Sequence, residues 1–197
     1  GDRVKRVKDV KGIHNAHVAA AKLVNSNYFF VVDGDAVIVD EFDFGYTTRE
    51  KDIVHVWRSQ NPINDLVYGY GGVKLFPRNN TINMDTSKSD MTTSISDKFK
   101  LMQDISNVTA FNVDEFSTWR SAFRECAKLS SKVIDRQKEE ETNERLKIWT
   151  TVGHDRPFGE HAIRGARAGM QFGLSNGADL RLINDFEWLR EQFDADV

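Results

Sequence analysis

An unbroken hydrophobic run at residues 28–32 is followed directly by Asp33, Gly34 and Asp35. β-Branched and aromatic residues in such a run predict a strand that is buried on both faces. The preceding segment, residues 12–24, is rich in alanine and places its apolar side chains on one helical face. The order predicts half of a parallel α/β layer, with ligand chemistry at the carboxyl end of the strand.

The remaining periodicity predicts strands at residues 52–58, 66–76 and 108–113, and helices at residues 117–134, 135–147, 159–169 and 180–193. The helix over 117–134 has the clearest apolar stripe, with Ser117 or Thr118 as its cap. Polar residues 79–98 predict a mobile loop, and residues 3–10 predict an exposed strand or loop. We therefore expect an α/β fold and a single domain over residues 1–197.

The composition narrows the class of protein. The chain has 197 residues, of which 40% are hydrophobic and 29% charged, as in soluble globular domains. A net charge of −3 provides no global attraction to nucleic acid or membranes, so polyanion binding requires a local patch. The single cysteine, Cys126, excludes an internal disulfide and a cysteine-based zinc site. A single cysteine also suits a reducing cytoplasm. The longest apolar run is too short to span a bilayer, and no signal-peptide pattern opens the sequence.

Asp33, Gly34 and Asp35, which we call the acidic tip, form a candidate cation site. Two carboxylates at the end of a buried strand are costly unless they bind something, and Mg²⁺ or Mn²⁺ prefers such oxygens. A diphosphate can complete the coordination shell, so Asp33 and Asp35 predict a site for a phosphate-bearing ligand. Gly34 between them would let the backbone pass close to that ligand. The alternative is an ordinary turn that carries two aspartates.

A glycine-rich stretch lies within the strand predicted at residues 66–76. It lacks the Lys-Ser/Thr pair of a nucleotide-hydrolase phosphate loop, so Gly71 and Gly72 more plausibly let the backbone approach a sugar ring. Trp57 and Tyr70 are candidates to stack on a sugar or a base. The alternative for both aromatic residues is a place in the core.

Basic residues recur every four positions in the helix predicted at residues 117–134. Arg120, Arg124, Lys128 and Lys132 would form one stripe that can follow the phosphates of DNA. The alternatives are a solvated helix face and, for Arg120 or Arg124, a contact with a donor diphosphate.

Three segments together resemble a known family. They are VKGIHNAHVAAAKLVNSNYFFVVDGDA (residues 10–36), YGYGGVKLFPR (residues 68–78) and PFGEHAIRGA (residues 157–166). In this order they resemble the landmarks of GT-A fold glycosyltransferases, over residues 10–193. The nearest group is the phage-encoded transferases thought to glycosylate hydroxymethylated bases in DNA, which occur alongside TET-like dioxygenases.

The resemblance implies a Rossmann-like mixed sheet flanked by helices and a donor that is a nucleotide sugar, most plausibly a UDP-sugar. Asp35 would ligate Mn²⁺ or Mg²⁺ directly, and Asp33 would contact ribose or a metal-bound water. A third ligand from the carboxyl-terminal half would be His154 or His161. Only 32 residues precede Asp33, fewer than in the family, so we expect a shortened nucleotide-binding half or an incomplete domain.

The third segment supplies the candidate base. If the reaction inverts the sugar, Glu160 would take the proton of the acceptor hydroxyl, with Asp155 as the alternative base. Glu160 would otherwise only complement the helix dipole, and a retaining reaction would need no such base. Two further alternatives are a transferase that acts on polysaccharide or protein, and a binding domain without catalysis.

Overall fold

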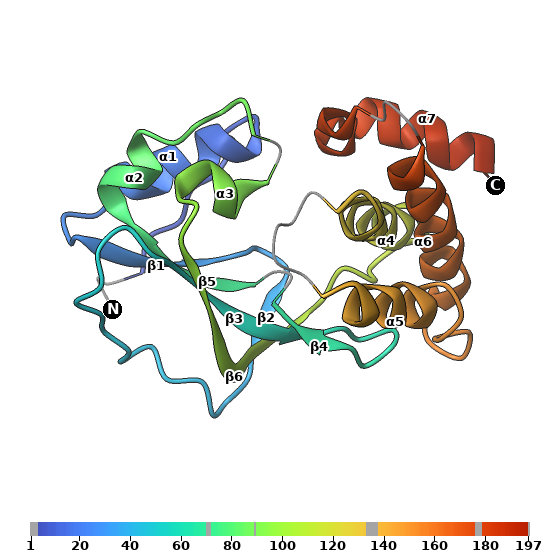
Figure 1. Ribbon diagram of the computed structural model, residues 1–197, viewed down its shortest axis with the longest axis horizontal. Helices are drawn as coiled ribbons and strands as arrows, with labels where there is room; N and C mark the ends of the chain where they lie inside the picture. Colours follow the sequence, from blue (N-terminus) through green and yellow to red (C-terminus); the bar gives the residue numbers. More distant parts are fainter. Residues whose placement is uncertain (1–3, 70–71, 89, 133–137, 176–178, 197) are drawn as a thin grey trace. The chain divides into compact units, whose positions relative to one another are not determined.

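The computed structural model describes residues 4–69, 72–88, 90–132, 138–175 and 179–196 (Figure 1). Contacts divide the chain into two compact units. The sheet unit comprises Gly1–Ser59 and Val67–Val108, and the helical unit comprises Gln60–Leu66 and Thr109–Val197. The single domain that we expect from the sequence is therefore built from two units, which are described separately.

The sheet unit has a six-stranded sheet in the order β1-β5-β3-β6-β2, with β4 paired to β3 outside this path. Its elements are α1 (Ile13–Lys22), β1 (Tyr28–Val32), β2 (Ala36–Ile38), β3 (Val54–Gln60), β4 (Val67–Tyr68), β5 (Val73–Pro77), α2 (Arg78–Ile82), α3 (Met91–Ile95) and β6 (Phe99–Thr109). Strand β5 runs antiparallel to both β1 and β3, within a sheet of mixed direction. An open mixed sheet with helices confirms the predicted α/β class.

Strand β1 differs from the prediction in its place in the sheet. It lies at the end of the strand order and pairs with β5, from Tyr28 opposite Pro77 to Val32 opposite Val73. Phe29 is buried, whereas Val32 is 43% exposed. Residues of β1 pack on both faces of the sheet, as predicted, although Val32 at its end is exposed. The predicted parallel layer is wrong for this strand, because strand neighbours depend on pairing that local hydrophobicity does not encode.

The hydrophobic run of β1 supplies both faces of the sheet. On one face Phe29 packs in a cluster with Val56 and Phe76 and with residues of α1 and α3, and Figure 1 shows α1, α2 and α3 together over this part of the sheet. On the other face Phe30 packs with Trp57, in a cluster that also receives side chains from the segment after β2. Successive strand residues point to opposite faces, so two covered faces require an unbroken apolar run.

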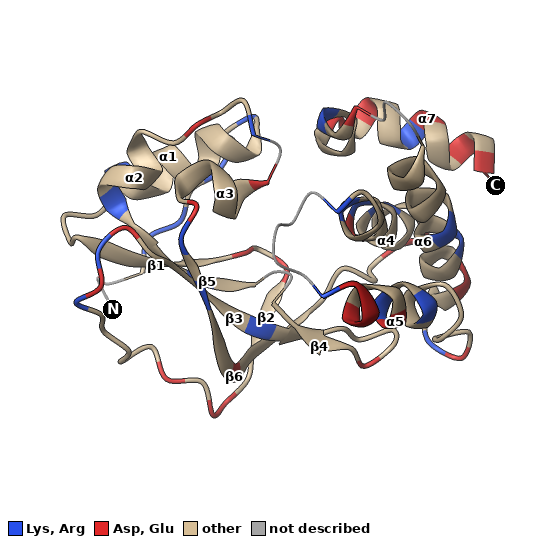
Figure 2. Cartoon of the chain, viewed as in Figure 1, with Lys and Arg blue, Asp and Glu red and all other residues tan. Residues whose placement is uncertain are grey.

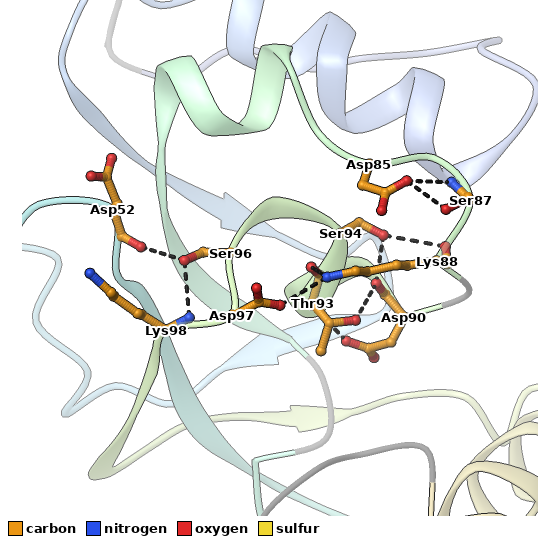
Figure 3. Close-up of polar contacts among 10 residues, drawn as sticks. All are labelled: Asp52, Asp85, Ser87, Lys88, Asp90, Thr93, Ser94, Ser96, Asp97 and Lys98. Carbon is orange, nitrogen blue, oxygen red and sulfur yellow. Dashed lines mark hydrogen bonds and ion pairs between the residues drawn. The ribbon is translucent and has the colours of Figure 1, made fainter.

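The segment predicted as a loop at residues 79–98 contains helices α2 and α3. Polar side chains in this segment stabilise its folded structure (Figure 3). Asp90 caps α3 by accepting from Thr93 N at 3.0 Å, and the Lys88 ammonium donates to Asp97 at 2.8 Å. From α1, His14 Nε2 lies 3.1 Å from the Lys88 carbonyl oxygen. The loop prediction failed because Asp, Ser and Thr side chains also serve as helix caps.

The helical unit contains α4 (Glu115–Ser130), α5 (Glu139–Trp149), α6 (Gly159–Leu174), the 3-10 helix η1 (Leu180–Asn184) and α7 (Phe186–Asp196). The helices predicted at 117–134, 135–147 and 159–169 are present with changed bounds, residues 133–137 being outside the described residues, and the helix predicted at 180–193 is divided into η1 and α7. Acidic residues open α5 (Figure 2). Asp114 caps α4 by accepting from Ser117 N at 2.6 Å, which replaces the predicted caps at 117 or 118. The predicted strand at 108–113 is largely wrong, since β6 ends at Thr109.

The backbone of α6 packs directly against the backbone of α4 at glycine positions. A Cβ atom on Gly165 would lie 2.3 Å from the Trp119 carbonyl oxygen, and one on Gly169 would lie 2.1 Å from that of Phe123. Gly173 continues the four-residue spacing along the same contact. Only glycine allows this approach, so the α4–α6 pair depends on three positions of α6. No helix in the described part of the chain combines the length and apolarity needed to cross a bilayer.

Candidate functional site

Asp33 joins the acidic tip to the glycine-rich segment. Its backbone N–H donates to the Gly72 carbonyl oxygen at 2.9 Å, and the Gly72 N–H donates to Asp33 Oδ2 at 3.1 Å. The Lys74 ammonium donates to the same Oδ2 at 3.0 Å. Two of the three segments that carry the family resemblance are therefore neighbours in space, because β1 pairs with β5.

These contacts keep Asp33 charged. Burial raises the pKa of the Asp33 carboxyl, but the Lys74 ammonium and the Gly72 N–H outweigh it and hold this pKa below its usual value. The Asp33 side chain remains 33% exposed. Both donors reach Oδ2, and no described residue donates to Oδ1. Asp33 is thus an ionised carboxylate whose Oδ2 accepts from two donors.

Lys74 was not anticipated as a site residue. It lies between buried Val73 and Leu75 on β5, and its own side chain is 13% exposed. His17 on α1 lies near this pair. Burial holds the pKa of His17 below its usual value, although the Ile13 carbonyl raises it. The Lys74 charge lowers the same pKa and the Asp33 charge raises it. A single charge inside an apolar strand was the sequence signal that could have identified Lys74.

Asp35 and Gly34 are exposed in the turn between β1 and β2. A Cβ atom on Gly34 would meet nothing within 4 Å, so open space surrounds this position. Asp33 and Asp35 supply the carboxylate oxygens that suit Mg²⁺ or Mn²⁺, which proteins often hold through one or two carboxylates and the phosphates of a substrate. Within the described residues, no group of three or more His, Cys, Asp or Glu side chains could hold a metal without such help.

Gly72 is fixed by a buried amide. Its φ is +91°, and a Cβ atom there would lie 2.0 Å from Asn107 Oδ1. Asn107 is fully buried and accepts from the Ser59 hydroxyl at 2.9 Å and from the Ser106 hydroxyl at 2.8 Å. This buried polar cluster supports the strand end that contacts Asp33, and no sequence pattern pointed to Asn107.

The two aromatic candidates have different outcomes. Trp57 is 2% exposed and packs against the rings of Phe30, Phe42 and Tyr46. The proposed stacking of Trp57 on a ligand is therefore corrected to a core role, the alternative weighed from the sequence. Tyr70 and Gly71 lie outside the described residues.

The basic stripe on α4 has partners inside the helical unit. The Arg120 guanidinium lies 4.3 Å from the centre of the Phe186 ring, and Arg124 donates to Asn184 Oδ1 at 2.9 Å. The Lys128 ammonium lies 2.9 Å from the buried Glu125 carboxylate. Lys132 falls beyond the end of α4. The alternative of a solvated helix face does not describe Arg120, Arg124 and Lys128, and a role in binding DNA stays a prediction.

His154 and Glu160 meet at the start of α6. A hydrogen bond joins His154 Nδ1 to Glu160 Oε1, and both side chains are more than half exposed. Asp155 is exposed in the turn between them. The structure thus brings together two residues that the sequence assigned to separate roles, one as a metal ligand and one as a base.

His161 has a different environment. Its Nε2 lies 3.7 Å from Glu115 Oε1, its ring packs near Phe193, and its buried Nδ1 has no hydrogen-bond partner. His154 and His161 therefore face different carboxylates within the helical unit. A role for either histidine as a third metal ligand stays a prediction.

Comparisons of the chain with protein-family models, with curated proteins and with solved structures find no match. Conclusions about function must therefore come from the residues and their geometry.

Proposed function

We propose that the protein is a metal-dependent glycosyltransferase that moves a sugar from a nucleotide sugar to a hydroxyl group. The observation that carries the proposal is the paired hydrogen bonding between Asp33 and Gly72. These hydrogen bonds make the acidic tip and the glycine-rich segment neighbours in space, although they are distant in sequence. Two such neighbouring motifs would suit a ligand that has both a diphosphate and a sugar.

The donor site in this proposal comprises Asp33, Gly34, Asp35 and Gly72, and Gly71, which lies outside the described residues, stays a prediction from the sequence. Asp33 and Asp35 would hold Mn²⁺ or Mg²⁺, which neutralises the charge of a departing diphosphate. The Lys74 ammonium beside Asp33 keeps the pKa of that carboxyl low, so that it remains an ionised oxygen donor. The exposed backbone at Gly34 leaves room for the ligand to approach.

The acceptor in this proposal is a hydroxyl group, and the resemblance favours one kind of molecule that carries it. A hydroxymethylated base in phage DNA is the acceptor that the family resemblance favours, with a UDP-sugar as donor and the host cytoplasm as the location. Arg120, Arg124 and Lys128 are the candidate DNA contacts, and their packing against Phe186, Asn184 and Glu125 means that they would bind DNA only with part of each side chain. A polysaccharide or protein acceptor requires none of these cations.

Donor binding is the decisive test. Titration calorimetry with UDP-, GDP- and CDP-sugars would be run with and without Mn²⁺ on the wild type, on Asp35→Asn and on Asp40→Asn. Asp40 is an exposed aspartate of the same unit and serves as the matched control. We expect Mn²⁺-dependent binding of one donor, weakened at least about 10-fold by Asp35→Asn because one metal ligand is lost, and unchanged by Asp40→Asn.

Failure of the wild type to bind any of these donors in the presence of Mn²⁺ would overturn the proposal. It would favour the alternative of a non-catalytic binding domain. Equal weakening by Asp35→Asn and Asp40→Asn would show that binding depends on general negative charge and not on the acidic tip.

A further inference from the structure

Residues 4–12, in front of α1, are three consecutive tripeptides that each begin with valine and lysine. They read VKR, VKD and VKG, and we call them the basic segment. The segment has one acidic residue, Asp9, and four basic residues, which are Lys5, Arg6, Lys8 and Lys11. Its net charge is therefore +3, in a chain whose net charge is −3. Because the whole chain does not attract polyanions, such a local patch is what polyanion binding requires.

The basic segment is fixed alongside α1 in the sheet unit. The Lys5 ammonium donates to the Leu23 carbonyl oxygen at 2.6 Å, at the carboxyl end of α1. The Asn15 amide, in the first turn of α1, donates to the Lys11 carbonyl oxygen at 3.1 Å. The segment therefore runs antiparallel to α1. Since α1 has 10 residues and a rise of about 1.5 Å each, the cations are spread over about 15 Å.

The side chains of the basic segment face solvent. Every residue from 4 to 12 is exposed except Val7, which is half-buried. No helix or strand includes these residues, as the prediction of an exposed strand or loop allows. Within the described residues, the only backbone hydrogen bond of the segment is the one that the Gly12 carbonyl oxygen accepts from Ala16 N. The four cations thus stand on the surface and not over the core.

The cations of the basic segment differ from other lysines of the same unit. Lys74, Lys88 and Lys100 each pair with a carboxylate at 3.3 Å or less. None of the four cations of the basic segment forms an ion pair with a residue that the structure describes. Their mutual repulsion is therefore not offset by neighbouring acids, and a bound anion would relieve it.

We propose that the basic segment binds the phosphates of a nucleic acid. A row of cations about 15 Å long can face several phosphates of one strand, because duplex DNA carries one charge per about 1.7 Å of its axis. An anionic membrane suits the segment less, since its apolar side chains are valines without an aromatic anchor or an amphipathic helix. Contacts with phosphates carry no sequence information, so binding should be independent of sequence.

This inference concerns binding by the sheet unit and does not rest on the proposed sugar transfer. Calorimetry with nucleotide sugars tests the acidic tip, whereas binding of DNA tests the basic segment. Either proposal can therefore fail without the other.

The experiment measures the affinity of the full chain for a short fluorescent DNA duplex by anisotropy, in a series of salt concentrations. The main variant combines Arg6→Gln, Lys8→Gln and Lys11→Gln and keeps Lys5, which holds the segment to α1. Each phosphate contact contributes about 0.9 to the slope of log affinity against log salt, so we expect a slope smaller by about 2 to 3. At the lowest salt the affinity should fall at least about 10-fold.

Two control variants separate the segment from general charge. Arg49→Gln, Lys51→Gln and Lys98→Gln together remove three exposed cations of the same unit, but these alternate with Glu50, Asp52 and Asp97. This variant should keep the wild-type slope and affinity within about 2-fold. Lys8→Arg with Lys11→Arg keeps the charge and should also bind like the wild type. Thermal unfolding of every variant checks that the fold is retained.

Equal slopes for the wild type and the main variant would overturn the inference, as would equal losses in the main variant and in the variant at 49, 51 and 98. If the main variant unfolds at a lower temperature, the single variants decide, and Arg6→Gln, Lys8→Gln and Lys11→Gln should each reduce the slope by about 1. Tighter binding to vesicles of phosphatidylcholine and phosphatidylserine than to DNA would assign the segment to a membrane surface and overturn the nucleic-acid partner.

Discussion

Glycines make close contacts in both units, but they face different kinds of atoms. In the helical unit Gly165 and Gly169 of α6 face backbone carbonyl oxygens of α4. In the sheet unit Gly72 faces the side-chain oxygen of Asn107. A backbone atom cannot yield without moving a whole helix, whereas a side chain can be removed by mutation. The first contact is therefore rigid, and the second can be relieved.

The difference matters because only one of these glycines belongs to the candidate site: Gly72 donates to the Asp33 carboxylate, whereas Gly165 and Gly169 only pack two helices together. Substitutions at these positions separate the effect on folding from the effect on the site. They also test whether the two units respond as their contacts indicate.

The largest effect is expected for Gly169→Ala. The added Cβ would lie 2.1 Å from the Phe123 carbonyl oxygen, so α4 and α6 must move apart. We expect the free energy of unfolding to fall by about 3 kcal/mol or more, the upper range of overpacking. Urea unfolding measures the loss, and Gln171→Ala on the exposed side of the same helix should change it by less than about 0.5 kcal/mol. Similar values for the two variants would contradict backbone-to-backbone packing.

Gly72→Ala should have the next largest effect, about 2 kcal/mol, because it combines a clash with Asn107 and an unfavourable φ of +91°. Asn107→Ala in the same chain should recover part of the loss, with an interaction energy of at least about 0.5 kcal/mol in a double-mutant cycle. Strict additivity would mean that Asn107 moves aside at no cost. No such rescue is possible for Gly169→Ala, because the clash there is with the Phe123 backbone and not with a side chain. The two units should therefore differ in whether a second substitution restores stability.

Lys74→Met should destabilise the sheet unit by about 1 kcal/mol at neutral pH, a small value because the Asp33 side chain is 33% exposed. The pKa of Asp33 is lowered in the folded protein, so its contribution is present above the unfolded value and lost as the pH falls through the folded one. Unfolding at pH 7 and at successively lower pH should therefore show the wild type and the variant converging under acid. A constant difference would mean that Lys74 acts through its aliphatic chain.

Gly34→Ala should have the smallest effect on stability, below about 0.5 kcal/mol, since a Cβ atom there meets nothing within 4 Å. If Gly34 admits the donor, the same variant should weaken Mn²⁺-dependent binding of the nucleotide sugar several-fold. Thermal unfolding and calorimetry on one sample separate the two effects. Unchanged donor binding would remove Gly34 from the proposed site.

Local patterns predicted the longer helices and the position of Asp33 and Asp35, but not the short helices α2 and α3. The apolar stripe of α4, the alanine-rich α1 and the run of β1 are all encoded within short windows, and the structure has an element at each. The spacing of Gly165, Gly169 and Gly173 was also present in the sequence and signalled close helix packing, although the prediction passed over it. Bounds were less accurate, because caps such as Asp114 lie outside the apolar stripe.

The sequence by itself determined the α/β class, the positions of most elements and the two carboxylates after β1. Only the tertiary structure decided that β1 pairs with β5 at the end of the strand order, that Lys74 and Gly72 hold Asp33, and that Glu160 contacts His154. The physical reason is the separation in sequence between the residues that interact. Helix and strand periodicities arise between near neighbours in the chain, whereas strand pairing, ion pairs and buried amides join residues that become neighbours only after folding.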